Sequence, residues 1–298
     1  MHIYIAKNVV MVYNIFDFKI GGIYMSISII SEFKDKDIFF NHSISPFPDD
    51  SVFFSHTHDI CEIIFLKKGD VSGIISGKEY KLRKNDLIIF RPGTLHRIRI
   101  DGSTEYERTD ILFDEKVLAN NVFNNIPQDM NVIHCSENEP IAENIKRLDI
   151  YCQEFFGEDL KKLITGLVEE IIFNLTLANS KKNEDIYVNP LADMAIDFID
   201  NNFTNQIDID DICDVLYISK SHLHHLFRDK FNISPKKYIN MQRLEKARNM
   251  IRSGKKPCDV YTCCGFTDYA TFYRNYKLHF GHIPSLENEI EIIRDIKS

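Results

Sequence analysis

The last third of the chain contains the same apolar pattern twice. In both copies, apolar side chains spaced four residues apart lead to a proline, and the copies lie 49 residues apart. The matched positions are Leu223, Phe227, Phe231 and Pro235 in the first copy and Phe272, Tyr276, Phe280 and Pro284 in the second. A spacing of four residues places side chains on one face of an α-helix. The repeat therefore predicts two similar helical units that bury this face.

Each copy predicts a helix-turn-helix. A short helix is followed by a turn of three or four residues and by a second helix, which begins at Ser219 in the first copy and at Thr267 in the second, because Ser and Thr cap helix N-termini. The second helix leaves polar and basic side chains on its outer face, where they can donate to base edges and phosphates. The residues that we expect to contact DNA are Lys220, Ser221, His222, His224, His225, Arg228, Lys236, Lys237, Ala270, Thr271, Tyr273, Arg274 and Lys277.

A further helix is predicted between the two units. Ser234 followed by Pro235 is a typical helix start, and Ser253 and Gly254 end the helix after Arg252. About 18 residues at 1.5 Å each give a connector of roughly 27 Å. Successive major grooves on one face of B-DNA lie about 34 Å apart. A connector of this length can hold the two outer helices in neighbouring grooves.

The charge distribution supports nucleic acid as a partner of this region. The whole chain has 36 Lys and Arg against 44 Asp and Glu, a net charge of -8, which by itself disfavours a polyanionic partner. Residues 220–282, however, contain 13 basic and 4 acidic residues, a net charge of +9, and the rest of the chain carries -17. The positive charge therefore lies on the repeated units.

Over about 100 residues, the repeated region resembles the DNA-binding domain of AraC/XylS-type transcriptional regulators. The residues that carry the resemblance are 212–223, Phe227, Arg228, Ser234, Pro235, Tyr238, 243–248, 265–268, Phe272, Arg274, Phe280, Gly281 and Pro284. The resemblance implies that Ser221, His224, His225, Thr271 and Arg274 contact bases. It also implies promoter DNA and RNA polymerase as partners and a homodimer as the assembly.

The chain departs from this family pattern at a few positions. Tyr217 stands in place of the usual turn glycine of the first copy. The small residue of the first helix is Cys213 in the first copy and the bulky Tyr261 in the second. Acidic residues 287–291 follow Pro284 where an aromatic-Arg ending is expected. These departures bear on how tightly the second unit packs.

The first half of the chain predicts a β-domain. Residues from about 27 to 113 contain short apolar segments bounded by Gly, Pro or Asn-Asp at intervals of roughly ten residues, which is typical of a sandwich or barrel. The predicted strands include 62–66, 71–75, 87–90 and 97–100. From Pro140 the apolar period becomes helical, and two amphipathic helices extend to about residue 179. We expect these helices to form a dimer surface.

Three histidines and a glutamate form a second candidate site, in the β-domain. The spacing of His56, His58 and Glu62, followed by His96 after a Pro-Gly turn, resembles the two-part signature of the cupin barrel, the sensor domain of many AraC-type regulators. Alternation along one strand places His56 and His58 on one face, with His96 on a facing strand. We expect an effector pocket lined by His56, His58, Glu62, Phe65, Phe90 and His96, with Phe53, Phe54 and Tyr106 as further candidates.

Two interpretations of this pocket stay open. In the first, its polar groups form hydrogen bonds around an organic effector, and no cofactor is required. In the second, His56, His58, Glu62 and His96 bind a divalent metal ion of the first transition row, since three imidazoles and a carboxylate are suitable ligands for such an ion.

The predicted fold is an α+β multidomain chain, with a cupin-like β-barrel followed by helices and an all-α domain. The segments are 1–26, an N-terminal arm or extension; 27–139, the effector-sensing β-domain; 140–179, a helical dimerisation segment; 180–187, a linker; 188–286, the DNA-binding domain; and 287–298, an acidic tail. No apolar segment reaches the ~18 to 20 residues of a membrane span, and no secretion signal is recognisable, so we expect a cytoplasmic protein. The seven cysteines, without a C-x-x-C pair, are expected to be reduced and buried.

The sequence is compatible with two functions. The leading hypothesis is a sequence-specific transcription regulator in which effector binding in the cupin-like domain controls promoter binding. The alternative is a metal-dependent cupin enzyme with a helical appendage. Because the sequence shows no nucleophile-base arrangement, phosphate loop or dinucleotide fingerprint, we expect that the protein is not an enzyme.

Overall fold

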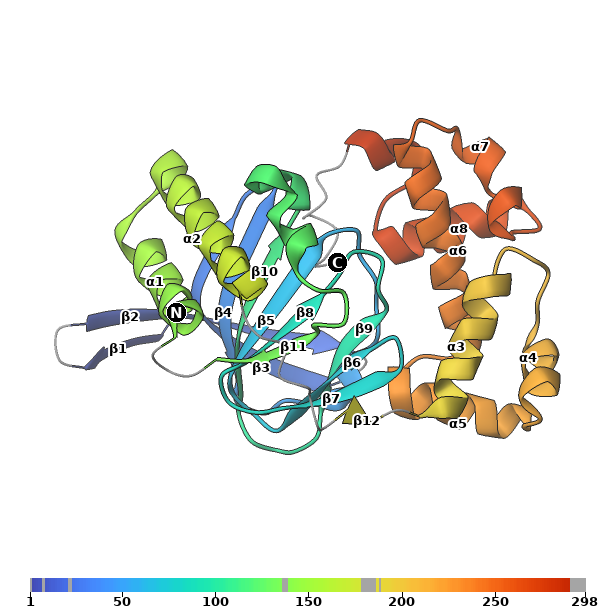
Figure 1. Cartoon of the computed structure of the whole chain (residues 1–298), viewed down its shortest axis with the longest axis horizontal. Coiled ribbons are helices and arrows are strands. Elements are labelled where there is room, and N and C mark those ends of the chain that lie inside the picture. Colours follow the sequence, from blue (N-terminus) through green and yellow to red (C-terminus); the bar gives the residue numbers. More distant parts are fainter. Residues whose placement is uncertain are drawn as a thin grey trace.

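The computed structural model describes residues 2–6, 9–20, 23–135, 139–177, 186–187 and 189–289. Within these ranges a β-rich half is followed by a helical half (Figure 1). The strands are β1 His2–Ala6, β2 Val9–Ile20, β3 Ile23–Lys34, β4 Ile38–Ser45, β5 Cys61–Lys68, β6 Val71–Ile75, β7 Lys78–Leu82, β8 Asp86–Phe90, β9 His96–Ile100, β10 Tyr106–Phe113, β11 Val132–His134 and β12 Ile186–Tyr187. The α-helices are α1 Pro140–Glu154, α2 Gly157–Leu177, α3 Pro190–Asn202, α4 Ile209–Leu216, α5 Lys220–Phe231, α6 Pro235–Arg252, α7 Pro257–Val260 and α8 Tyr269–Phe280. No described helix has both the length and the apolar character that crossing a membrane requires.

The strands form two antiparallel sheets. The larger has eight strands in the order β1-β2-β3-β4-β10-β5-β8-β11, and the smaller has four in the order β12-β7-β6-β9. The four strands named above from the sequence fall within β5, β6, β8 and β9, so their prediction is confirmed. The β-structure also begins earlier than predicted, because β1 and β2 pair as a hairpin and β3 starts at Ile23.

The central strands of the larger sheet are buried on both faces. One face packs against the smaller sheet through side chains such as Ile64, Phe90 and Ile98. The opposite face packs against α1 and α2 through side chains such as Ile63 and Ile164. Because both faces of the central strands are covered, these strands are continuous apolar runs in the sequence rather than alternating ones.

Helices α1 and α2 lie side by side over the larger sheet (Figure 1). Their apolar stripes, which include Leu148 and Leu167, are buried against the sheet. Phe156, Phe173 and Leu177 remain exposed on the outside of the pair. The main apolar faces are therefore covered within one chain, and the predicted role of this segment in dimerisation stays a prediction.

Helix α6 connects the two units of the helical half. It spans Pro235–Arg252, which confirms the predicted connector helix. Its first half adds Tyr238 and Met241 to the apolar core that α3, α4 and α5 share. Its second half adds Leu244 and Ile251 to a separate core with α8. One helix thus contributes to both cores and fixes the units relative to each other.

The outer helices of the two units begin at different kinds of cap. In the first unit, Ser219 accepts a hydrogen bond from the backbone N of His222 at 3.1 Å, as predicted. In the second unit the cap is Asp268, whose carboxylate accepts from the backbone N of Thr271 at 2.7 Å. The prediction of Thr267 as the cap is therefore wrong by one residue. The physical reason is that the second turn is one residue longer and offers a charged acceptor, which bonds a helix N-terminus more strongly than a hydroxyl.

The turn of the first unit has an unusual residue at a left-handed backbone position. Tyr217 ends α4 with φ 54°, and its side chain is exposed. Gly265 occupies the matching place in the second unit with φ 87°. Because left-handed backbone strains a residue with a Cβ, this turn is strained in the first unit, and the exposed tyrosine gains little from packing in return.

The predicted acidic tail does not begin at Glu287. This residue lies in the short 3-10 helix Pro284–Glu289 and is buried in the second unit. Its carboxylate accepts from Arg248 Nε at 2.8 Å, Arg252 Nε at 2.7 Å and Tyr276 Oη at 2.6 Å. The acidic residue that follows Pro284 is thus part of the core of the unit, while residues 290–298 of the predicted tail lie outside the described residues.

All seven cysteines are free thiols. Five are buried or half-buried, as predicted, but Cys258 and Cys263 are exposed. These two lie on α7 and the 3-10 turn Thr262–Cys264, short elements at the surface of the second unit that bury only one side.

Candidate effector site and nucleic-acid interface

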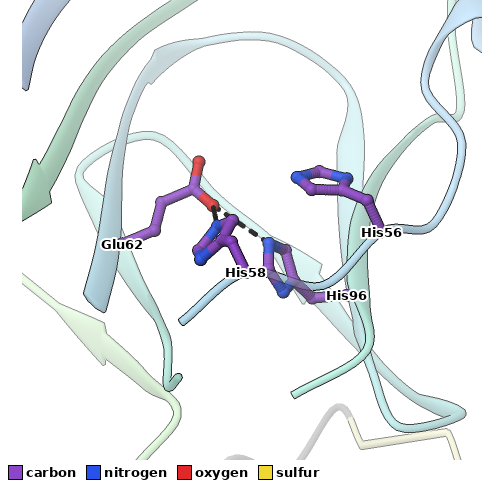
Figure 2. Close-up of side chains that lie close together, drawn as sticks. All are labelled: His56, His58, Glu62 and His96. Carbon is purple, nitrogen blue, oxygen red and sulfur yellow. Dashed lines mark hydrogen bonds and ion pairs between the residues drawn. The ribbon is translucent and has the colours of Figure 1, made fainter. Parts of the chain in front are cut away.

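His56, His58, Glu62 and His96 converge in the β-domain (Figure 2). Each offers one potential ligand atom, and these atoms all lie within 4.8 Å of one another. Glu62 is on β5 and His96 is the first residue of β9. The two other histidines lie in the extended segment before β5 rather than in a regular strand, and His56 pairs with His96 through backbone hydrogen bonds of 3.0 Å in both directions.

The three imidazole rings are oriented by backbone carbonyls. Nδ1 of His58 lies 2.9 Å from the carbonyl oxygen of Ile60, Nδ1 of His96 lies 2.8 Å from that of Thr94, and Nδ1 of His56 lies 3.2 Å from that of Phe54. Since a carbonyl only accepts hydrogen bonds, each Nδ1 carries a proton. In a neutral ring the proton on Nδ1 leaves a lone pair on Nε2, the arrangement found in metal-binding histidines.

The free nitrogens meet one carboxylate oxygen. Nε2 of His58 and Nε2 of His96 lie 2.9 and 3.0 Å from the same Oε2 of Glu62. Two lone pairs and a carboxylate oxygen repel one another unless a proton or another cation lies among them. The cluster is therefore built to hold positive charge.

The pKa shifts of the cluster show how that charge is shared. Burial raises the pKa of Glu62, but the hydrogen bonds and charges of the two histidines outweigh burial and hold it well below its usual value. Burial lowers the pKa of His58, yet the hydrogen bond to Glu62 reverses the shift and raises it. Burial prevails at His96, whose pKa is lowered. Burial and the charge of His96 lower the pKa of His56 to about 3, so His56 stays neutral and can donate a lone pair.

A cavity of about 850 Å³ lies between the β-domain and the helical half, with the cluster in its wall. This volume is in the range of small-molecule sites, roughly 300 to 1,000 Å³. The β-domain wall includes Phe53, Phe54, His56, His58, Glu62, Ile64, Phe90, His96, Tyr106 and Arg108. The helical wall includes Lys236, Lys237, Asn240, Met241, Leu244, Arg248, Asn275, Leu278 and His279.

One residue expected in this pocket does not line it. Phe65 follows Ile64 on β5 and points to the opposite face of the sheet, where it packs in the core beneath α1 and α2. Side chains alternate along a strand, so Glu62 and Ile64 face the cavity and Phe65 cannot. Including Phe65 was therefore wrong. The same alternation on β10 places Arg108 on the cavity side together with Tyr106. Arg108 was not among the residues expected in the pocket.

The outer face of α5 is open to solvent. Ser221, His224, His225 and Arg228 are exposed on it, together with His222. The residues predicted to point inward, Leu223, Leu226 and Phe227, are buried. The amphipathic division of this helix is thus the predicted one, and the exposed face carries only side chains that can donate or accept hydrogen bonds.

The outer face of α8 is smaller and partly organised by its own contacts. Ala270, Arg274 and Lys277 are exposed, while Thr271 and Tyr273 are half-buried. Arg274 donates from Nη2 to the hydroxyl of Thr271 at 3.3 Å. The guanidinium is therefore held over the first turn of the helix.

Several cations of the basic window bind within the protein. Lys220 pairs with Asp210, Lys230 with Glu79 of the β-domain, and Arg252 with Asp59 of the β-domain. Arg248 pairs with Glu287, and Arg243 donates to the carbonyl oxygens of Phe203 and Asn205. The net charge of +9 therefore exceeds the charge that the surface offers to DNA.

Lys236 and Lys237 occupy the first turn of α6, in the cavity wall. The Lys237 ammonium lies 4.9 Å from the ring centroid of Phe54, a cation-π contact between the two halves of the chain. The structure therefore brings these lysines to the boundary between the halves, and their contact with DNA stays a prediction.

Two family models match the chain, one in each half. Residues 44–148 match the AraC-like ligand binding domain, and residues 212–286 match a helix-turn-helix domain. A ligand-binding β-domain followed by paired helix-turn-helix units defines a DNA-binding protein with its own sensor. The chain belongs to the AraC family of transcription regulators, and it is not an enzyme. The alternative of a cupin enzyme is thereby set aside.

Characterised relatives agree with this assignment. The chain is 23% identical over 244 residues to the HTH-type transcriptional activator RhaS of Shigella sonnei, covering 76% of this chain and 84% of that protein. It is 30% identical over 129 residues to the Msm operon regulatory protein of Streptococcus mutans, covering 43% of this chain and 44% of that protein.

Solved structures resemble the chain more distantly. A crystal structure of an apo ToxT variant from Vibrio cholerae covers 90% of this chain and 97% of that chain, with 12% identity and a TM-score of 0.39. The AraC-like transcriptional activator CuxR covers 80% of this chain and 86% of that chain, with 14% identity and the same TM-score of 0.39.

Proposed function

We propose that the protein controls transcription by binding promoter DNA through α5 and α8, and that a small molecule in the cavity between its halves regulates this binding. The observation that carries the proposal is the position of the cavity. One wall belongs to the ligand-binding domain and the other to α6 and α8 of the helix-turn-helix units. A ligand that contacts both walls stabilises those arrangements of the two halves in which it makes both sets of contacts, relative to all other arrangements.

The outer faces of α5 and α8 contact the DNA. Ser221, His224 and His225 read bases from α5, Thr271 and Arg274 read them from α8, and neighbouring exposed cations such as Arg228 and Lys277 bind phosphates. Base contacts of this kind set sequence preference, whereas phosphate contacts set salt dependence.

The DNA interface can be tested with single substitutions in the full chain. DNA selected from a random-sequence pool serves as the probe, and fluorescence anisotropy gives its affinity. Arg228→Ala and Arg274→Ala should each weaken binding, whereas Lys162→Ala, which removes an exposed cation from α2, should not. Equal affinities for all four proteins would refute the assignment of these helices.

The organic effector is expected to carry oxygen acceptors. Tyr106 Oη and Arg108 Nη1 are buried in the cavity wall and have no hydrogen-bond partner among the described residues. Buried donors without partners are costly, so a ligand that accepts from both gains affinity from satisfying them. Tyr106→Phe should weaken effector binding, measured by calorimetry with candidate sugars and organic acids, while leaving DNA affinity without effector unchanged.

A divalent metal ion is the second candidate occupant, and one observation favours it. One ring nitrogen of each of the three histidines and an oxygen of the Glu62 carboxylate lie within 4.8 Å of one another, which is close enough for a single ion to bind all four after it displaces the protons between them. Zn²⁺, Fe²⁺ and Mn²⁺ bind such ligand sets, and the ion would neutralise the carboxylate and orient an oxygen ligand of the effector. Elemental analysis of protein purified without chelator should find about one metal ion per chain in the wild type and none in His58→Ala. Metal-free wild type that also fails to take up added metal would refute the site.

The assembly and partners follow from the same family role. A homodimer would use the exposed outer side of α2, where Phe173 and Leu177 lie one turn apart. Phe173→Asp should then convert the dimer to a monomer in sedimentation experiments. The relative named as a transcriptional activator supports activation through RNA polymerase, and a regulator of this class acts in the cytoplasm.

A further inference from the structure

The segment 55–59 lies between the histidine cluster and the DNA-binding half. Around the bridge at His56 the segment runs like a strand, so successive side chains point in opposite directions. His56 and His58 point toward Glu62 and His96 (Figure 2). The side chains of Thr57 and Asp59 instead contact the helical half, and so does the backbone N of Ser55. The even positions therefore serve the cluster and the odd positions serve the other domain.

The odd positions contact α5, which is one of the two recognition helices (α5 and α8), and α6, which joins them. The backbone N of Ser55 donates to the carbonyl oxygen of Phe231, the last residue of α5, at 3.0 Å. Thr57 Oγ1 donates to Glu245 Oε1 on α6 at 2.9 Å, in a buried contact. The Asp59 carboxylate pairs with Arg252, at the end of α6.

A chain of polar contacts continues from Asp59 to the second unit. Arg252 bonds Glu287 as well as Asp59, and Glu287 accepts from Tyr276 of α8 at 2.6 Å. The segment thus reaches α5 through Phe231 and α8 through Arg252. A displacement of its backbone would therefore change contacts with both helix-turn-helix units.

In these contacts the attraction between carboxylates and guanidinium groups is opposed by repulsion between neighbouring carboxylates. Glu245 is buried, and its Oε2 has no hydrogen-bond partner within the described ranges. The Asp59 carboxylate lies close enough to Glu245, Arg248 and Arg252 to interact with their charges. Asp59 and Glu245, which belong to different domains, therefore share the cation Arg248, and Asp59 also pairs with Arg252. Because a buried ion pair gains little net free energy, a small movement of the segment can change the stability of these contacts.

We infer that a divalent metal ion at His56, His58, Glu62 and His96 increases DNA affinity by holding the segment 55–59 in the conformation that docks the helix-turn-helix units. The inference rests on the proposed metal site and deepens it. A bound ion would hold a ring nitrogen of His56 and one of His58 at about 2.0 to 2.1 Å from itself. Two alternate residues of the segment are then anchored on the cluster side, which stabilises the contacts of Ser55, Thr57 and Asp59 on the other side.

Docking leaves the proposed DNA-binding faces free. Ser221, His225 and Arg228 on α5 and Arg274 on α8 remain exposed while the segment makes its contacts. The docked arrangement therefore orders both recognition helices without covering them. By reciprocity, DNA binding should tighten metal binding by the same factor.

The test uses the full chain, Co²⁺ as the metal probe and a DNA fragment selected with the wild-type protein. Co²⁺ binding is followed by visible absorption, and DNA affinity by anisotropy with and without Co²⁺. Wild-type protein should gain about 5- to 150-fold in DNA affinity, the usual range of such coupling. Thr57→Val and Asp59→Asn should keep Co²⁺ binding and lose most of the gain. Thr104→Val, the same change in an exposed loop, should retain it.

The possible outcomes distinguish DNA binding, the metal site and the coupling between them. Absence of DNA binding by every form would refute the proposed function itself. DNA binding without Co²⁺ uptake, or uptake that persists unchanged in His58→Ala, would refute the metal site and the inference with it. Uptake at the cluster with unchanged or reduced DNA affinity, or full coupling in Thr57→Val, would overturn the inference alone.

Discussion

The buried carboxylate of Glu287 should be the main polar support of the second helix-turn-helix unit. Its side chain is fully buried and accepts hydrogen bonds from Arg248, Arg252 and Tyr276 at 2.6 to 2.8 Å. Glu287→Ala leaves two guanidinium groups beside an apolar methyl group. Removing one partner of a buried ion pair costs about 3 to 5 kcal/mol. Since 1.36 kcal/mol corresponds to a factor of ten, local opening should become about 150 to 5,000 times more frequent.

Amide hydrogen exchange read by mass spectrometry localises this loss. Peptides from α6 and α8 should exchange faster in Glu287→Ala, whereas peptides from β5 and β10 should be unaffected, because opening of one unit is local. Asp214→Ala, which removes an exposed carboxylate from α4, is the matched control. Protection of α8 within a factor of three of wild type would refute the assigned role of Glu287.

The same contact predicts a pH dependence with a definite sign. Burial raises the pKa of Glu287, but the charge and hydrogen bond of Arg248, the hydrogen bond of Tyr276 and the charge of Arg252 outweigh burial and lower it below its ordinary value of 4.5. A lowered pKa in the folded state means that the stabilisation is present above pH 4.5 and is lost as the pH falls through the folded-state pKa. The difference between wild type and Glu287→Ala should therefore be constant near neutral pH and shrink in acid.

Three further substitutions test the helical units, each by thermal unfolding followed with circular dichroism. Tyr217→Gly should stabilise the chain by about 0.5 to 1 kcal/mol because it removes left-handed strain; destabilisation would show that the tyrosine has a packing role. Asp268→Ala should cost about 1 kcal/mol, as loss of a helix cap does, while Thr267→Ala should have little effect; the reverse order would contradict the observed cap. Leu223→Ala should cost about 2 to 5 kcal/mol because Leu223 is fully buried, and a loss below 1 kcal/mol would mean that the site relaxes around the cavity.

Much of the helical half could be predicted from sequence because its signals are local. The stripe that contains Leu223 and Phe227, and the Ser234-Pro235 start of α6, each depend on neighbours within one or two helical turns. The cap of α8 was misplaced because Thr267 and Asp268 are both good caps, and only the length of the turn decides between them.

The cavity was only half predictable. The β-domain wall of the cavity follows from the alternation of side chains along β5. Phe65 was wrongly included because it lies an odd number of residues from Glu62 and therefore points to the opposite face of the sheet. The wall formed by α6 and α8 has no local signal, because docking between Asp59 and Arg252 joins residues 193 positions apart. The burial of Glu287 was missed for the same reason, since its partners lie on other helices.

Hydroxyl-radical footprinting of the full chain on DNA selected from a random pool shows whether α5 and α8 both bind the duplex. Two recognition helices joined by α6 should protect two patches on one face of the duplex, about one helical turn apart. Arg274→Ala should weaken the patch assigned to α8 more than the other patch. A single patch that survives both Arg228→Ala and Arg274→Ala, or no protection at all, would contradict the account.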